Sequence, residues 1–230
     1  MTLNLPEELK HCTGKGVKVA VIDSGIDLNS PMSKNVKAGI GIGWDGEKVF
    51  YHDDIQDEHG HGTKICGILL KRAPKAELYI ARIFEKRLLN EMDCLVEGIE
   101  WAIRQKVNII NASLGTTSTW DIDGLKKACQ RAYKKNVIIV SSLDGRNRIA
   151  YPGWFRNVLC VYNANHLPLK RRKKLIFGFE GESIKHCANS YLAPLLSSLI
   201  ACYFEKSGYA DPNSIIENLF GHFADGRRYE

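Results

Sequence analysis

The sequence predicts an α/β fold in three layers, with a mainly parallel β-sheet covered by helices on both faces. Short β-branched runs alternate along the chain with segments of helical period, as in strand–helix–strand units. The first of these runs, Val17–Ile22, is rich in β-branched residues, which is typical of a buried parallel strand. With 230 residues, 44% of them hydrophobic, the chain suits one sizeable domain or two small ones. No repeat or low-complexity linker divides it, so we expect one domain over residues 1–230.

The predicted strands are short apolar runs rich in valine and isoleucine. Each run has the length of a strand and is bounded by polar or turn-forming residues. In chain order these runs are Val17–Ile22, Leu78–Phe84, Val107–Ala112, Val137–Ser142 and Val158–Tyr162.

The predicted helices have apolar residues three and four positions apart. In the first of them Ile65, Ile68 and Leu69 share one face, and in the last Asp211 is followed by a proline at the first helical position. The helical segments are His61–Lys71, Glu91–Lys106, Asp121–Lys134, Ser190–Phe204 and one that opens at Asp211-Pro212.

Three polar residues stand where ligands bind in folds of this kind, beyond the carboxyl ends of strands. Asp23 ends the first strand in VAVIDSGID, His61 opens a helix in GHGT, and Ser190 lies at a helix start in ANSYLAP. Taken singly, they fit a turn carboxylate, a capping histidine and an N-cap serine. Together they supply the hydroxyl, the imidazole base and the orienting carboxylate that acyl transfer at a peptide bond requires.

The motifs around these residues resemble those of the subtilisin-like serine proteases, in the same Asp, His, Ser order. The resemblance runs from about Thr13 to Phe204 and rests on several ordered motifs. Besides Ser190, Ala193 and Pro194, the matching segments are Gly16–Asp27, His61–Thr63 with Gly67, Gly98–Ile103, Ser113–Gly115 and Tyr151–Gly153.

The resemblance implies a subtilisin-like fold and a serine endopeptidase that needs no catalytic cofactor or metal. Ser190 would be the nucleophile, His61 the general base and then acid, and Asp23 the residue that orients His61. Ser113, Leu114 and Gly115 would bind an extended peptide by adding it as a strand to their edge. The partner is therefore expected to be a flexible polypeptide.

The chain departs from the family pattern where an oxyanion would be stabilised. Asp144 stands at the position of the usual asparagine, after Leu143 in place of a glycine, and Ala188-Asn189 replaces the usual Gly-Thr. An ionised carboxylate cannot donate a hydrogen bond, whereas a protonated Asp144 could, since burial and a nearby negative charge raise a carboxyl pKa. Asn147 is the alternative donor, through a different loop register. These departures predict low, selective activity.

Two further segments leave alternatives open. Leu88, Leu89, Asn90 and Met92 either crowd the substrate cleft or belong to a loop that does not touch substrate. The KRRKK run at Lys170–Lys174 is by default a solvated face, but near a cleft it would attract an acidic peptide.

Charge and composition bound the partners and the compartment. The net charge of +6 suits an acidic partner but is too small to indicate nucleic acid, and no apolar run is long enough for a membrane span. The N-terminal MTLNLPEELKHC lacks a signal pattern, and the seven scattered cysteines read as reduced thiols, so we expect a cytoplasmic protein.

The sequence also bears on a calcium site and on two other functions. Asp53, Asp54, Asp57 and Glu58 could bind Ca²⁺, although their spacing is irregular. The altered residues near Ser190 also fit a protein that keeps the fold only to bind extended peptides. A dinucleotide site is disfavoured, because Gly41–Gly46 neither follows the first strand directly nor opens a helix.

Overall fold

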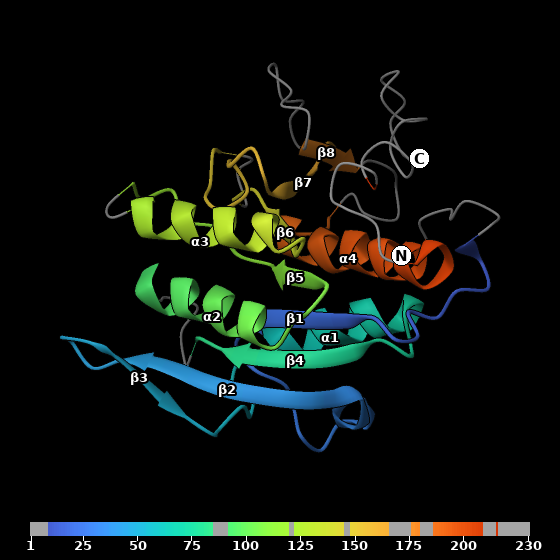
Figure 1. The fold of residues 1–230 in the computed structure, drawn as a ribbon, viewed down its shortest axis with the longest axis horizontal. Coiled ribbons are helices and arrows are strands. Elements are labelled where there is room, and N and C mark those ends of the chain that lie inside the picture. Colours follow the sequence, from blue (N-terminus) through green and yellow to red (C-terminus); the bar gives the residue numbers. More distant parts are fainter. Residues whose placement is uncertain are drawn as a thin grey trace.

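A single mixed β-sheet forms the middle layer of the protein (Figure 1). The computed structural model describes residues 9–84, 92–119, 122–144, 148–165, 176–179, 186–208 and 215. Within them the sheet has the order β3-β2-β4-β1-β5-β6-β7-β8, and all neighbours pair in parallel except β2 with β3. The strands are β1 (Lys18–Asp23), β2 (Val36–Trp44), β3 (Val49–His52), β4 (Glu77–Arg82), β5 (Ile109–Ala112), β6 (Ile138–Ser142), β7 (Leu159–Asn163) and β8 (Ile176–Phe179).

Helices cover both faces of this sheet. Helices α1 (His61–Arg72) and α4 (Leu192–Ser207) pack on one face, where they share an apolar core with β1 and β5. Helices α2 (Met92–Arg104) and α3 (Ile122–Lys134) pack against each other on the opposite face. The predicted three-layer α/β fold is therefore confirmed (Figure 1).

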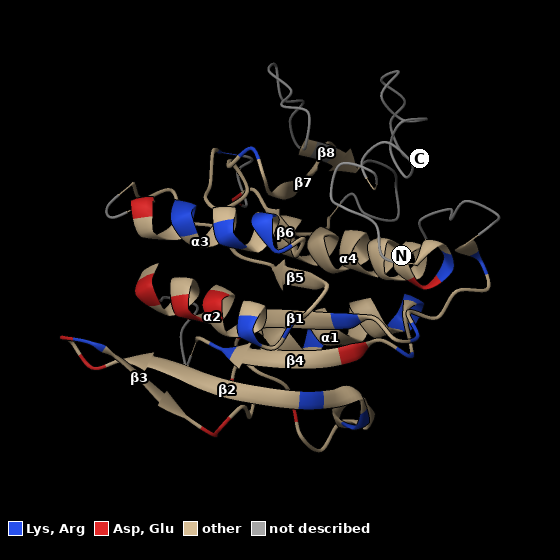
Figure 2. Cartoon of the chain, viewed as in Figure 1, with Lys and Arg blue, Asp and Glu red and all other residues tan. Residues whose placement is uncertain are grey.

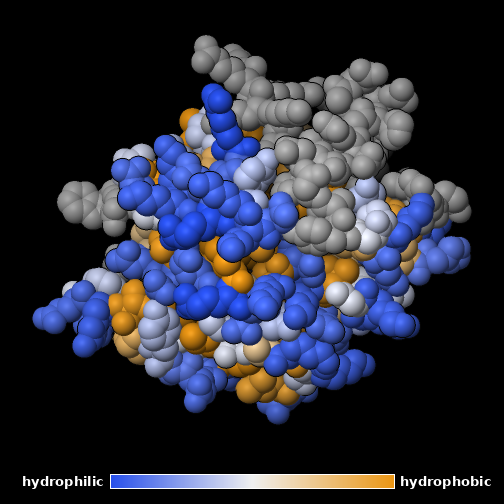
Figure 3. All heavy atoms as spheres, viewed as in Figure 1, coloured by the Kyte–Doolittle hydropathy of each residue, from blue (hydrophilic) through white to orange (hydrophobic). Residues whose placement is uncertain are grey.

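Charges at the ends of α2 and α3 match the direction of their dipoles. Asp93 and Asp123 lie in the first turns of the two helices, while Arg104 and Lys134 lie in their last turns (Figure 2). Acidic groups near a helix N-terminus and basic groups near its C-terminus are stabilising. On the face in view most of the coloured surface is hydrophilic, with hydrophobic side chains gathered in smaller patches (Figure 3).

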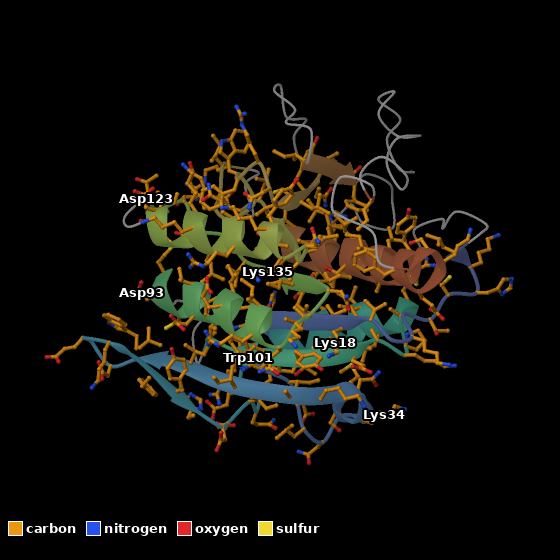
Figure 4. The ribbon with its side chains drawn as sticks, viewed as in Figure 1. Lys18, Lys34, Asp93, Trp101, Asp123 and Lys135 are labelled. Carbon is orange, nitrogen blue, oxygen red and sulfur yellow. The ribbon has the colours of Figure 1, made fainter. Side chains whose placement is uncertain are left out.

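An aromatic contact joins α2 to the sheet. Trp101 of α2 lies 6.5 Å from the ring centroid of Tyr79 in β4, and the ammonium of Lys18 in β1 lies 5.7 Å from the same centroid (Figure 4). Both rings are buried, so together they cover apolar surface on this face of the sheet.

The five predicted strands are confirmed as β1, β4, β5, β6 and β7, and four predicted helices as α1 to α4, with ends that differ by at most three residues. One boundary was wrong in a way that matters for the site. Ser190 lies in a 3₁₀ turn, η4 (Asn189–Tyr191), and α4 begins only at Leu192. The helix predicted from Asp211-Pro212 lies almost wholly outside the described residues.

The prediction missed β2, because its sequence VKAGIGIGW is interrupted by glycines that weaken a strand pattern. The structure explains two of them. A Cβ on Gly41 would lie 1.9 Å from the His52 ring, and one on Gly43 would lie 2.3 Å from the Phe50 ring. The glycines therefore let the aromatic side chains of β3 lie across β2.

Of the helices in the described part of the chain, none combines the length and apolar character that crossing a bilayer requires.

Candidate active site

Asp23, His61 and Ser190 meet at one edge of the sheet although they lie far apart in the sequence. Asp23 is the last residue of β1, His61 is the first of α1, and Ser190 lies in η4. The His61 Nδ1 is 2.7 Å from Asp23 Oδ1, and its Nε2 is 3.2 Å from Ser190 Oγ. A hydroxyl, an imidazole and a carboxylate thus form one continuous hydrogen-bonded chain.

The environment of His61 favours its charged form. Burial alone lowers the pKa of the imidazole, but the hydrogen bond and charge of Asp23 raise it, as does the charge of Asp57. The net effect is a pKa above the ordinary value. Since Asp23 is fully buried and accepts a hydrogen bond from the Ser24 N–H, its carboxylate is fixed in place to bond the Nδ1 side of the ring.

Asp57 holds the loop that carries His61. Its carboxylate accepts hydrogen bonds from the backbone N–H groups of His59, Gly60 and Thr63 at 2.7–3.0 Å. It also accepts from two hydroxyls, Ser24 Oγ at 2.9 Å and Thr63 Oγ1 at 2.6 Å. Burial raises the pKa of Asp57, but these bonds outweigh it and the net pKa is lowered.

The prediction treated Asp57 only as a possible calcium ligand. Asp57 lies four residues before His61, at which a helix is predicted to begin. This position was the signal that could have assigned Asp57 to capping that helix.

Two glycines in the recognised motifs allow a close approach of two backbones. Gly25 has a φ of +107°, which side-chain-bearing residues rarely adopt. A Cβ on Gly62 would lie 2.2 Å from the Gly25 carbonyl oxygen. Glycine at both positions therefore brings the start of α1 against the end of β1, which sets the distance between His61 and Asp23.

Asn189 fixes the turn that carries Ser190. Its side-chain oxygen accepts from the Asn163 N–H at 2.7 Å, and its amide donates to the Asp144 carbonyl at 2.5 Å. The Asn163 amide in turn donates to the Cys187 carbonyl at 2.9 Å. Asn189, which departs from the family pattern, is therefore buried and connects the turn to the ends of β6 and β7 through its hydrogen bonds.

Asp144 lies beside the turn that carries Ser190, but its carboxylate bonds within its own loop. It accepts from the backbone N–H of Arg148 at 2.6 Å and forms an ion pair with the same residue's guanidinium. An ionised carboxylate has no proton to donate to an oxyanion. The role of Asp144 in an oxyanion hole stays a prediction, and Asn147 lies outside the described residues.

The predicted peptide-binding segment directly follows β5. Ser113 is buried and its Oγ accepts from the Asn111 amide at 2.7 Å, while the Leu114 carbonyl accepts from Ser141 Oγ at 2.9 Å. Gly115 is exposed, and a Cβ there would lie 2.9 Å from that of Ala150. The segment is therefore fixed by its neighbours and reaches the surface just beyond the strand that pairs with β1.

Three of the four acidic residues considered for calcium have basic or backbone partners. Asp54 pairs with the guanidinium of Arg82, Glu58 lies 3.8 Å from the same group, and Asp57 is occupied by the loop described above. Among the described residues, no three His, Cys, Asp or Glu side chains gather closely enough to hold a metal ion. These residues do not fit a calcium site, and no step below involves one.

The remaining predicted features are the cleft segment, the KRRKK run and the cysteines. Leu88 to Asn90 and the KRRKK run lie outside the described residues, whereas Met92 is the first residue of α2 and packs against the core on that face. All seven cysteines are free thiols. Burial raises the pKa of Cys66 and of Cys187, so neither is activated as a thiolate.

Comparison with known proteins finds proteases of similar sequence. The chain is 31% identical over 188 residues to the minor extracellular protease Epr of Bacillus subtilis, covering 76% of this chain and 27% of that protein. It is 31% identical over 181 residues to an intracellular serine protease of Paenibacillus polymyxa, covering 69% and 53%. The chain thus spans between about a quarter and about half of these relatives' lengths.

A solved structure of similar fold and a family model of the sequence both match this chain. The crystal structure of the nisin leader peptidase NisP from Lactococcus lactis superposes with a TM-score of 0.71, at 18% identity, over 92% of this chain and 86% of that one. This likeness shows a shared fold. The model of the subtilase family matches residues 14–214, and the chain therefore belongs to the subtilase family.

Proposed function

We propose that this protein is a serine endopeptidase that cleaves extended polypeptides through Asp23, His61 and Ser190. The observation that carries the proposal is the unbroken chain of hydrogen bonds from Asp23 through His61 to Ser190. We further propose that residues 1–230 act as one peptidase domain without a catalytic metal or cofactor.

In the first half of the reaction, Ser190 Oγ attacks the scissile carbonyl carbon while His61 Nε2 takes the hydroxyl proton. Asp23 stabilises the imidazolium that forms and keeps the ring in the correct tautomer. The tetrahedral intermediate collapses when the C–N bond breaks, and His61 gives its proton to the leaving amine. Ser190 then carries the acyl group as an ester.

In the second half, His61 takes a proton from water, which attacks the ester carbonyl. Collapse of this second intermediate releases the new carboxylate and returns the proton to Ser190 Oγ. The backbone N–H of Ser190, at the start of the helical segment leading into α4, would donate to each oxyanion. Asp144, held by Arg148, is a poor second donor, which supports low and selective activity.

The substrate would lie along Ser113, Leu114 and Gly115 as an added strand. The fixed geometry of this segment, next to the end of β5, supports that role. The charge of +6 supports an acidic partner peptide, so a narrow role in processing such a peptide or protein is the more specific proposal. We expect neither nucleic acid nor a membrane as partner.

The proposed location is the cytoplasm. The free thiols of all seven cysteines and the similarity to a protease named as intracellular support it.

A phosphonofluoridate probe tests the central proposal. We expect a covalent adduct on Ser190, detected by mass, that disappears in Ser190→Ala and is much reduced in His61→Ala. The matched control is Ser198→Ala, a buried serine in α4 that bonds the Leu195 carbonyl and lies away from the triad. No labelling between about pH 5 and pH 9 would contradict the proposal.

A second function, peptide binding without hydrolysis, is favoured by one observation: the Asp144 carboxylate is committed to Arg148 where the family usually has a donor. Labelling of Ser190 together with cleavage of any peptide would exclude it. Tight peptide binding with no labelling would support it instead.

A further inference from the structure

The aromatic residue that follows the nucleophile lies against the catalytic imidazole. The ring centroid of Tyr191 is 5.5 Å from that of His61, with an angle of 28° between the two planes, so the rings are stacked. Tyr191 is the last residue of η4, and its backbone N–H donates to the Ala188 carbonyl at 3.0 Å. One short turn therefore carries both the hydroxyl that bonds His61 and the ring that stacks on it.

The two hydrogen bonds of His61 resist small tilts of its ring only weakly. The bonds to Asp23 and Ser190 act within the plane of the imidazole, at its two nitrogens. Rotation about the Cβ–Cγ bond tips both nitrogens out of this plane, and a hydrogen bond loses little energy at small departures from linearity. A ring stacked on its face opposes this rotation directly, because the imidazole cannot turn without losing that contact or clashing with it.

A lysine from α1 holds Tyr191 from outside. The Lys64 ammonium lies 4.2 Å from the Tyr191 ring centroid, within the range of a cation–π contact. Lys64 stands three residues after His61 on the same helix, so α1 supplies both the imidazole and the cation that contact this ring. Tyr191 also packs against the apolar core beneath α1 and α4, which restricts it further.

We propose that Tyr191 is a positioning residue for His61, which keeps the imidazole plane aligned with Ser190 and is itself held by Lys64. The inference rests on the proposed protease function. It assigns no contact between Tyr191 and the reacting atoms, so its effect should fall on turnover through the orientation of His61 rather than on substrate binding.

Steady-state kinetics on a cleaved peptide test this role with a matched pair of variants. Tyr191→Leu removes the ring and is expected to lower kcat about tenfold with KM nearly unchanged, because the base is misaligned in the transition state. Tyr191→Phe keeps the ring and should restore kcat to within about twofold of the parent protein. Tyr191→Met, a flexible apolar side chain of similar bulk, replaces the leucine variant if that one fails to fold.

Lys64→Met is a second test, with a smaller expected effect on kcat. It should lower kcat by about two- to threefold, and it should move the rise of kcat/KM with pH to higher pH, because the Lys64 charge lowers the pKa of His61. The other groups facing His61 are Asp23 from β1, Asp57 from the preceding loop, His59 edge-on and Tyr191 itself. None of them is altered in this variant.

The outcomes separate this inference from the proposed function. A parent protein that cleaves peptide while Tyr191→Leu keeps full kcat, or raises KM alone, would overturn the positioning role and leave the protease standing. A rise in KM alone would mark the ring as part of the substrate-binding surface. A parent protein that neither labels nor cleaves would overturn both.

Discussion

The two halves of the active site are built differently. In the half that holds the base, Asp57 is buried and accepts five hydrogen bonds that order the loop before His61. In the half where the oxyanion would form, Asp144 bonds to Arg148, whose side chain is 59% exposed. The Asp57 carboxylate is thus enclosed by its donors, whereas the Asp144 carboxylate pairs with a surface side chain that water can reach.

For the proposed protease, this difference indicates where activity would be limited. Hydrogen bonds join Asp23 to His61 and His61 to Ser190, so the proposed proton transfer would start from an aligned arrangement. Stabilisation of the oxyanion would rely on the Ser190 backbone, because Asp144 stands where the family usually has a side-chain donor. Variants in the base half should therefore lose activity, while the right change in the oxyanion half should gain it.

The largest effect is expected from Asp57→Ala. Removing the carboxylate leaves the N–H groups of Gly60 and Thr63 without their acceptor, which should cost about 3 kcal/mol of stability. The His61 loop would shift, and a misplacement of about 1 Å lowers turnover by about 10²-fold. Urea unfolding and kcat/KM measure the two losses.

Asp53→Ala is the matched control for Asp57→Ala, because Asp53 is an exposed acidic residue of the same loop. It should change both quantities little. Equal effects of the two substitutions would show that the loop tolerates the loss of its enclosed carboxylate, and the contrast between the halves would fail.

Asp144→Asn should raise kcat by about tenfold. The amide supplies an N–H₂ donor where the carboxylate offers none, and one oxyanion-hole donor is worth about 10²–10³ when ideally placed. The gain is smaller here because the substituted amide would still have the Arg148 side chain beside it. Single-turnover acylation of an ester substrate is the measurement.

Asp144→Ala distinguishes the possible causes of a change at this position. If the carboxylate merely repels the oxyanion, the alanine variant should also gain activity, but less than the asparagine variant. A loss of activity in the alanine variant alone, with activity kept in the asparagine variant, would show that a protonated Asp144 donates a hydrogen bond in the parent protein, and the kcat of the parent should then fall at high pH as that proton is lost.

The pH dependence should follow His61, which acts as a base only when neutral. Its pKa is raised above the ordinary value of 6.5, so kcat/KM should increase with pH around a midpoint above that value. Because the charge of Asp57 raises this pKa, Asp57→Asn should move the midpoint to lower pH. An unchanged midpoint would show that Asp57 acts on His61 through the loop geometry and not through its charge.

Much of the base half could be predicted from the sequence, since the DSG and GHGT motifs fall at the ends of a clear strand and helix. The hydrogen bonds of Asp57 were missed because three of its five donors are backbone N–H groups, so only its position before the predicted helix indicated them. Strand β2 was missed because its glycines mask the strand pattern, and the rings of β3 that require two of them lie beside them only in the folded sheet. Asn189 appeared as a departure from the family, yet its bonds to Asn163 and Asp144 form only once β6 and β7 are adjacent.

The smallest effect is expected from Glu205→Gln, at the end of α4 remote from Ser190. The Glu205 carboxylate accepts the N–H groups of Thr13, Gly14 and Lys15, joining the start of the described chain to the last turns of α4. Burial raises the pKa of Glu205, but these bonds outweigh it, so the net pKa is lowered and the carboxylate stabilises the fold above its unfolded-state pKa.

The glutamine keeps an acceptor oxygen but loses the charge, so about 1 kcal/mol of stability should be lost at neutral pH. The difference from the parent should shrink as the pH falls and Glu205 takes up a proton in the parent protein as well. Most of the length of α4, about 20 Å of helix, separates this carboxylate from the nucleophile turn, so kcat should not change at a temperature where both proteins are folded. A fall in kcat at that temperature would mean that α4 transmits the effect of the Glu205 hydrogen bonds to Ser190. The position of Ser190 would then depend on more than the hydrogen bonds of Asn189.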